Sequence, residues 1–463
     1  MRNAPETVRV LSHYQPTALG EGANLPVSGR EKEGSVRTRT PLRPRRVAAA
    51  ILVIALVATG AVLASSASAT SHGNVTLRVD LFGDFGYHDL YKQFEKAHPG
   101  VTIKEDIESY ADHHANLAKH LATGAGADDV VAIEVGFISQ FKSEPQYFYD
   151  LNQFGASKLK SQWLPWKWAQ SIAPNGAQIG LGTDVGSMGI CYRKDLMQAA
   201  GLPTSREAVS KLWPTWADYI KTGEKFEAKA PKGTYFFDSG SNVFNAMIGQ
   251  LNPAYYDAQG NVIVANNPQV KQAWNATMTG IAKGESAGLA AFSTSWNTGF
   301  QQGNFATVTC PAWMMGYIQG QAPKTAGDWD IAAVPGGGGS WGGSFLAIPK
   351  QSKNADMAYQ LIKFLTSPAS EAYVFKQTGN LPSEPVVYNN PAIANFKNPF
   401  FSNAPVGKIF TSSVKELKPQ ITGPHQGDIQ TAVSNAIQRV EQNKQTPAQS
   451  WAQFLKDVQN VAT

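Results

Sequence analysis

The stretch Val75-Thr76-Leu77-Arg78-Val79-Asp80-Leu81 opens the part of the chain that decides the fold. It is rich in β-branched and apolar residues and ends at a glycine-bearing turn, so it predicts a strand. A helix is predicted from His88 to His98, before a Pro-Gly pair, and a second strand over Val101 to Ile107. Asn116 to Thr123 lies in a predicted helix closed by glycine, and Asp129-Val130-Val131-Ala132-Ile133-Glu134 is a largely apolar third strand. This order predicts an α/β lobe with a ligand crevice at the carboxyl ends of its strands.

The loops that follow the first and third of these strands are where a ligand site is expected. They carry Asp84, Phe85, Tyr87 and Glu134, which combine acidic and aromatic side chains.

Farther along the chain, the segment from Tyr192 to Ala306 predicts a second α/β or mainly helical unit. The stretch from Val334 to Gly343 contains six glycines, and it lacks the lysine of a phosphate-binding loop, so we interpret it as a flexible connection. Amphipathic helices are predicted over Ala355–Leu365 and Asp428–Val440, and a terminal helix over Trp451–Val461.

The amino-terminal end has the features of an export signal. Residues 1–46 have a mixed polar composition that predicts disorder. Residues 47–69 are uncharged and mostly apolar, follow several arginines and end in Ala67-Ser68-Ala69, a site suited to a signal peptidase. A retained membrane anchor is the alternative, because about 18 apolar residues can cross a bilayer. No cysteine for lipid attachment follows the apolar run.

Length and charge limit the class of protein. A chain of 463 residues exceeds the size of a single small core and is expected to divide into lobes. The net charge of +5 equals the net charge of residues 1–46 alone, so the folded part is neutral. A neutral body lacks the basic surface that binds nucleic acid.

The two cysteines, Cys191 and Cys310, leave two interpretations open. An even number in an exported chain favours a disulfide, while a pair of buried free thiols is the alternative that spacing cannot exclude. Two cysteines are too few for a zinc site.

Motifs of hydrolases, zinc proteases, redox proteins and calcium loops are absent from the sequence. The adjacent His113 and His114 come nearest to a metal cluster. Because neighbouring helical residues point in different directions, we interpret them as a solvated helix start, and we expect no metal and no cofactor.

The aromatic content points to a ligand class. The chain has 11 tryptophans and 10% aromatic residues, and several of these lie in loops beside glycines and acids. Aromatic faces cover the apolar face of a sugar ring, and planar acids bond its hydroxyl groups. The residues that fit this pairing are Asp84 with Tyr87, Asp184, Asp238 with Tyr235, and Trp313. Packing is the expected role of Trp163, Trp166, Trp168, Trp213 and Trp216.

Five segments, in order along the chain, resemble the carbohydrate-binding proteins of ABC importers, the maltose-binding protein class in its actinobacterial branch. They are Asp80–Tyr87, Asp129–Glu134, Gly182–Gly186 followed by Ile190–Leu196, Tyr235–Asp238, and Asn304–Trp313. The resemblance runs from about Leu77 to the carboxyl terminus.

The resemblance implies a periplasmic-binding-protein-like fold with two α/β lobes joined by a three-segment hinge. Lobe 1 is expected over residues 74–188 plus 311–347, and lobe 2 over 189–310 plus 348–463. The ligand residues implied are Asp84, Tyr87, Glu134, Asp184, Tyr235, Asp238 and Trp313, with Trp341 and Gln426 added where the sequence departs from the family near its end. Because Cys191 and Cys310 fall on neighbouring crossover strands of that fold, the resemblance also implies that they pair.

The function implied is that of a secreted or cell-surface solute-binding protein and not of an enzyme. It would close over an oligosaccharide by hinge motion and pass it, as a monomer, to a membrane permease. The alternatives are a secreted glycoside hydrolase, which also combines aromatic residues with carboxylates, and a binding protein for another solute class.

Overall fold

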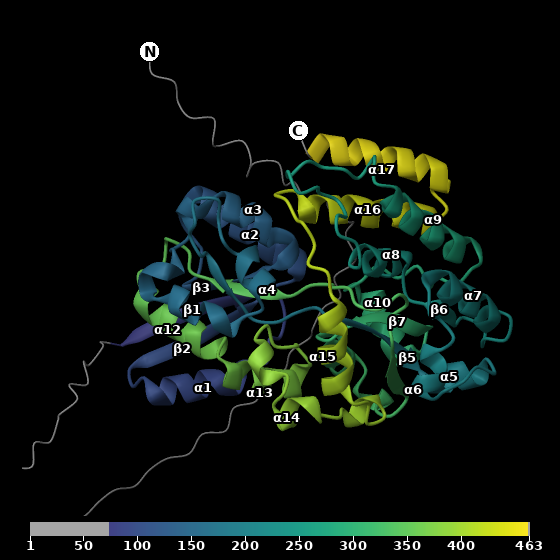
Figure 1. Ribbon diagram of the computed structural model, residues 1–463, viewed down its shortest axis with the longest axis horizontal. Coiled ribbons are helices and arrows are strands. Elements are labelled where there is room, and N and C mark those ends of the chain that lie inside the picture. Colours follow the sequence, from purple (N-terminus) through teal and green to yellow (C-terminus); the bar gives the residue numbers. More distant parts are fainter. Residues whose placement is uncertain (1–73, 462–463) are drawn as a thin grey trace, which may run out of the picture. The chain divides into compact units, whose positions relative to one another are not determined.

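The first sheet of the computed structural model, which describes residues 74–461, is built from the segments that open the folded chain. Its strand order is β2-β1-β3-β9-β4, with β1, β2 and β3 parallel and β9 antiparallel to both of its neighbours. The strands are β1 (Val75–Leu81), β2 (Val101–Ile107), β3 (Val130–Glu134), β4 (Gly180–Gly182) and β9 (Ser344–Ala347). The three predicted strands are therefore confirmed, and they form the parallel half of the sheet (Figure 1).

Helices that pack around this sheet begin and end at the residues that favour those positions. Helix α1 (His88–Ala97) stops before Pro99, as predicted. Helix α2 (Tyr110–Thr123) contains the predicted Asn116–Thr123 segment, and Ser109 caps its start by accepting a hydrogen bond from the Asp112 backbone N–H at 3.2 Å. Helix α3 (Val135–Ser143) follows β3 directly, and α4 (Pro165–Gln170) lies farther along the chain.

The second sheet has the order β6-β7-β5-β8, in which β6 and β7 are parallel and the other pairs are antiparallel. The strands are β5 (Met188–Arg193), β6 (Tyr235–Phe237), β7 (Phe305–Pro311) and β8 (Trp329–Ala332). A disulfide joins Cys191 on β5 to Cys310 on β7, with 5.4 Å between the Cα atoms. The predicted pairing is confirmed.

Helices make up most of the chain around the second sheet. They are α5 (Lys194–Ala199), α6 (Arg206–Ser210), α7 (Trp216–Glu227), α8 (Gly240–Ile248), α9 (Pro268–Ala282), α10 (Thr294–Gln302), α11 (Met314–Gln321), α14 (Pro391–Ala394), α15 (Val406–Glu416), α16 (Gln426–Glu441) and α17 (Pro447–Val461). In Figure 1, α16 and α17 run beside each other next to α8 and α9. Apolar side chains of α8, α9 and α16 share one core with β5 and β6.

Three segments carry the chain between the two sheets. Residues 183–187 lead from β4 to β5, residues 333–343 lead from β8 to β9, and a third segment follows α13 (Pro368–Thr378). These segments lie side by side, because Val185 bridges Leu381 and Ser187 bridges Ser340. The glycine-rich stretch is thus one of the connections, as the sequence predicted.

Several segments belong to a different lobe from the one that the predicted boundaries assign. Strand β8, predicted in lobe 1, pairs with β5 in the second sheet. Helix α12 (Ala355–Leu365), predicted in lobe 2, packs its Leu361 and Leu365 into the core that contains β1. The segment Asn304–Trp313, expected to return to lobe 1, instead contains β7 and leads into α11, so the chain stays with the second sheet until residue 333.

The predictions for residues 1–46 and 47–69 lie outside the described residues. Within the described range, none of the helices is both long enough and apolar enough to span a membrane.

Candidate functional site

A cavity of about 940 Å³ lies among residues from both sheets and their helices. One side comes from the β1–α1 loop, the start of α2 and the end of β3. The other side comes from α8, the loop that precedes α10, α11 and α16. A volume of this size suits a ligand of several ring units, since pockets for small molecules commonly measure about 300–1,000 Å³. The carboxyl ends of β1 and β3 therefore open on the cavity, as the α/β pattern predicted.

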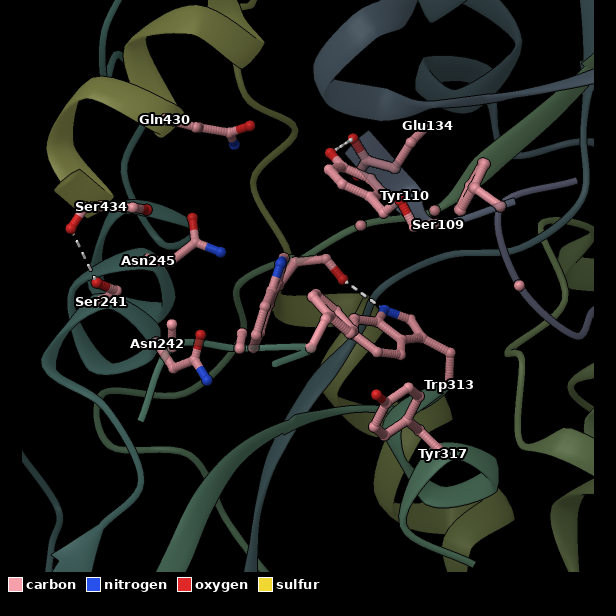
Figure 2. A pocket seen from close by; sticks show the side chains of 18 of the residues that line it. Ser109, Tyr110, Glu134, Ser241, Asn242, Asn245, Trp313, Tyr317, Gln430 and Ser434 are labelled. Atoms are coloured by element: carbon pink, nitrogen blue, oxygen red, sulfur yellow. Dashed lines mark hydrogen bonds between the residues drawn. The ribbon is translucent and has the colours of Figure 1, made fainter. Parts of the chain in front are cut away.

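One wall of the cavity consists of uncharged hydrogen-bonding side chains. Figure 2 shows Ser241, Asn242 and Asn245 on α8 near Gln430 and Ser434 on α16. The two helices are tied together where the Ser241 hydroxyl donates to the Ser434 carbonyl oxygen at 3.5 Å. Amides and hydroxyls both donate and accept hydrogen bonds, so this wall can pair with ligand hydroxyl groups that act as donors or as acceptors.

Asp238 lies beneath this wall and does not line the cavity. Its side chain is fully buried, and its Oδ2 accepts hydrogen bonds from the Asn242 amide at 2.5 Å and from the Trp296 indole N–H at 2.7 Å. Burial raises the pKa of Asp238 to about 7. The prediction that Asp238 contacts ligand is corrected: it orients Asn242, which does line the cavity.

Glu134 ends β3 and caps α3, which places its carboxyl group at the cavity wall. Its Oε2 accepts a hydrogen bond from the Gly136 backbone N–H at 2.5 Å and from the Tyr110 hydroxyl at 3.1 Å (Figure 2). The Glu134 backbone N–H donates to Nε2 of His114 at 3.1 Å. Burial of the residue, 8% exposed, raises the pKa of Glu134 to about 7. Glu134 thus lines the cavity as a hydrogen-bond acceptor that Gly136 and Tyr110 hold in place, and its charge changes near neutral pH.

Asp184 and Asp84 line the same cavity from two other segments. Asp184 lies on the first connection between the sheets, and its Oδ1 accepts from the Thr183 hydroxyl at 2.9 Å and the Ser344 backbone N–H at 2.8 Å. Burial raises the pKa of Asp184. Asp84 is exposed and accepts from the Gly86 backbone N–H at 2.7 Å, which shapes its own turn. The three acids from separate strand ends converge on one cavity.

The positive charge of a buried lysine, outside the cavity lining, interacts with the carboxyl groups of Asp184 and Glu134. The Lys167 side chain is 1% exposed, and its Nζ lies 3.8 Å from the centre of the Phe345 ring. Burial lowers the pKa of Lys167 to about 8, against the attraction of Asp184 and Glu134. Lys167 is not among the lining residues, so its charge acts on the acids and not on the ligand directly.

Aromatic rings line the side opposite the amide wall. Trp313 and Tyr317 lie next to each other in Figure 2, and Trp341 and Phe292 line the same region. The Trp313 indole N–H donates to the Trp341 carbonyl oxygen at 2.9 Å, and the two rings meet edge to face with centroids 5.5 Å apart. This bond fixes the orientation of the Trp313 ring while leaving the residue partly exposed to the cavity.

Five of the nine predicted ligand residues line the cavity: Asp84, Glu134, Asp184, Trp313 and Trp341. Tyr87 is buried in the first core beside Phe85, and Gln426 is buried at the start of α16. Tyr235 begins β6 with an exposed side chain outside the lining. These three residues and Asp238 therefore lie outside the lining of the cavity, contrary to the ligand contact that the sequence predicts for them.

Sequence reasoning missed the amide wall and several rings. The missed residues include Tyr110, Ser241, Asn242, Asn245, Phe292, Tyr317, Gln430, Ser434 and Gln438. The available signal was the spacing of four between Gln430, Ser434 and Gln438, which aligns uncharged polar side chains on one face of α16. Such a stripe is the normal pattern of a solvent-facing helix, so spacing alone does not identify a site.

The interpretation of His113 and His114 as a solvated helix start is wrong, because both side chains are buried. His113 contacts the Asp80 carboxylate at 3.0 Å and the Ala132 carbonyl oxygen at 2.7 Å. His114 contacts the Tyr110 carbonyl oxygen through Nδ1, and burial holds its pKa well below its usual value. Since His114 accepts from the Glu134 backbone, the neutral ring supports the end of β3.

Comparison with known proteins gives a consistent picture. A family model described as bacterial extracellular solute-binding protein matches residues 89–400. An arabinooligosaccharide-binding protein of Bacillus subtilis (strain 168) is 28% identical over 299 residues, and a protein of the same name from Halalkalibacterium halodurans is 24% identical. These matches cover 60% and 62% of this chain, and the chain spans 65% and 64% of the length of these curated relatives.

Solved structures share the fold over most of the chain. One described as an extracellular solute-binding protein of family 1 is 40% identical, with a TM-score of 0.74, and covers 84% of this chain and 100% of its own. The binding protein from B. animalis subsp. lactis Bl-04 in complex with β-1,6-galactobiose has the same TM-score at 19% identity, covering 84% of this chain and 98% of its own. Two lobes of the α/β type are therefore shared with these structures.

Proposed function

Because the chain belongs to the bacterial extracellular solute-binding protein family, we propose that it binds a neutral oligosaccharide in the cavity between its lobes. It delivers this ligand unchanged to the membrane permease of an ABC importer. Binding closes the lobes about the three connecting segments, and the protein acts as a monomer outside the cell membrane.

The observation that carries this proposal is the chemistry of the cavity lining. Amides and hydroxyls of α8 and α16 face aromatic rings and three carboxylates, an arrangement that matches the hydroxyl rim and the apolar face of a sugar ring. Among the described residues, no lysine, arginine or histidine lines the cavity. An anionic ligand would meet carboxylates and no cation among the lining residues to pair with it, so the site disfavours an anionic ligand.

The names of the relatives support a sugar ligand, and those of the curated relatives support an oligosaccharide. Two curated relatives are named for arabinooligosaccharides, and one structural neighbour is a complex with a disaccharide. A cavity of about 940 Å³ accommodates several sugar units.

Binding without turnover is supported by the family, whose model is described as an extracellular solute-binding protein, and the acids of the site suit the role of hydrogen-bond acceptors. Asp184 bonds a backbone N–H and a neighbouring hydroxyl, and Glu134 bonds a backbone N–H and a tyrosine. These bonds fix the acids as acceptors at the wall of the cavity. We also propose that residues 47–69 direct export of the protein, either as a signal peptide that is cleaved or as a membrane anchor that is retained.

Calorimetry with arabino-, xylo-, cello- and malto-oligosaccharides, a free amino-acid mixture and a dipeptide tests the ligand class. We expect heat of binding with one or more of the sugars and with neither of the other ligands. Chromatography of the same mixtures after prolonged incubation tests turnover. Shorter sugar products would show a glycoside hydrolase, and binding of the dipeptide alone would show a different solute class.

A further inference from the structure

Phe292 has a backbone conformation that a bulky side chain rarely adopts. Its φ angle is +65°, in the left-handed region, where most non-glycine residues are disfavoured. It lies directly before Ser293, the capping residue of α10, whose hydroxyl accepts from the Trp296 backbone N–H at 3.2 Å. Strain of this kind persists only where surrounding contacts hold it, and it concentrates at ligand-binding positions.

The contacts that hold Phe292 come from both sides of the cavity. Its ring is nearly parallel to Tyr110, on the first lobe, at a centroid distance of 6.3 Å and an interplanar angle of 20°. It is also nearly parallel to Trp313, at 6.2 Å and 24°. Trp296 and Tyr317 meet it edge to face at 5.3 and 5.5 Å. Phe292 is therefore the ring through which aromatic side chains of the two lobes meet.

Despite these four neighbours, Phe292 remains 43% exposed and lines the cavity. A ring that served only to pack would be expected to bury most of its apolar surface. The exposed part of the ring instead adds an apolar face to the cavity, which Trp313 and Tyr317 also line. The Tyr110 hydroxyl donates a hydrogen bond to the Glu134 carboxylate. The Phe292 ring therefore contacts the residue that positions Glu134.

We propose that Phe292 is a ligand-contacting residue that stacks on a sugar unit and closes the aromatic side of the site across both lobes. This inference rests on the proposed function, because the stacking partner is a sugar ring. The strained backbone presents the ring to the ligand, and the four neighbouring rings hold it there.

The test compares Phe292→Asn with Phe292→Tyr, and uses Val386→Asn as a control at an exposed apolar side chain outside the cavity. Asparagine tolerates the left-handed conformation and removes the ring, whereas tyrosine keeps the ring. Titration calorimetry uses α-1,5-arabinotriose, xylotriose, cellotriose and maltotriose. We expect Phe292→Asn to weaken binding of the best trisaccharide about 5- to 150-fold, the range for loss of one stacking contact. Phe292→Tyr and Val386→Asn should stay within about threefold of the parent.

The ligand-free melting temperature separates a ligand contact from a packing role. We expect Phe292→Asn to melt close to the parent temperature, because relief of the backbone strain offsets part of the ring contacts that are lost. Unchanged affinity in Phe292→Asn, or an equal loss in Phe292→Tyr, would overturn the inference while the proposed function stood. If the parent bound none of the four trisaccharides, the proposed function would fail and the inference with it.

Discussion

The carboxyl group of Glu134 shows how a single residue joins the fold to the site. Its backbone completes β3, its side chain caps α3, and its Oε2 is held by Tyr110. Because the same burial that positions the group also raises its pKa to about 7, the acceptor strength of the site depends on pH.

We therefore predict that sugar affinity falls as the pH decreases from 8 to 5. An ionised carboxylate accepts hydroxyl hydrogen bonds more strongly than a protonated one, so affinity should fall by up to about tenfold per pH unit below 7. Glu134→Gln should bind more weakly at pH 8 and lose most of this dependence. Calorimetry of the parent and the variant from pH 5 to 8 measures this dependence. The pH dependence that remains in the variant is attributed to titration of Asp184 and Lys167. A parent affinity that is constant from pH 5 to 8 would contradict the prediction.

Trp313 provides a second prediction at the scale of a residue. Its indole N–H is occupied by Trp341, which leaves the ring face as its means of contacting ligand. Trp313→Ala should weaken sugar binding by about 1–3 kcal/mol, on the scale measured for stacked bases. The melting temperature of the ligand-free protein should change little. A large fall in melting temperature with intact affinity would instead mark Trp313 as a packing residue.

The sequence predicts the acids at the strand ends of the site but not the residues that distant helices bring to it. Asp84 and Glu134 were predictable because they follow strands of a parallel sheet, whose carboxyl ends meet at one edge. Asp238 also follows a strand, but the buried Asn242 and Trp296 bind its carboxylate. Phe292 and the residues of α8 carry no local signal, since their position at the cavity depends on how distant helices pack.

At the scale of elements, the disulfide staples β5 to β7 within the second sheet. It closes a loop with a sequence separation of 119 residues. Loops of this length restrict the unfolded chain strongly, so the double variant Cys191→Ala, Cys310→Ala should lose about 2–5 kcal/mol of unfolding free energy. Neither cysteine lines the cavity, and affinity should stay within about threefold of the parent. Urea unfolding with and without reductant measures the loss, and equal stability of parent and variant would contradict it.

Most elements were predictable, whereas their assignment to lobes was not. The boundaries of β1, β2 and α12 match the predicted ranges because each has a clear apolar pattern. The lobe of α12 depends instead on where the chain crosses between sheets. These crossings are set by backbone contacts such as Trp341 N–H to Gly186 carbonyl oxygen at 2.9 Å, which leave no periodic trace in the sequence.

At the scale of the whole molecule, buried acids set a common response to pH. Burial raises the pKa of Glu384 to about 8 and of Glu285 to about 9, besides Glu134 and Asp238 near 7. Within the described part of the chain, the two carboxyl oxygens of Glu285 and the two of Glu384 have no hydrogen-bond partner. Each of these acids is protonated in the folded protein at pH values where it is ionised in the unfolded chain. The folded state thus binds more protons than the unfolded state between about pH 4.5 and 8.

Since stability falls with pH wherever the folded state holds more protons, the free energy of unfolding should decrease from pH 5 to pH 9. Each acid contributes a slope of at most about 1.4 kcal/mol per pH unit between its unfolded and folded pKa values. Lys167 acts in the opposite sense above pH 8, because burial lowers its pKa to about 8 and the unfolded chain then holds the extra proton. Glu285→Gln keeps the shape of the side chain and removes its proton, so its unfolding free energy should vary less with pH than that of the parent. The exposed Glu207→Gln is the matched control, since its side chain lies outside the core, and it should follow the parent curve. Urea unfolding at pH 5, 7 and 9 decides the matter: a parent stability that rises over this range would show that the buried acids ionise in the folded protein.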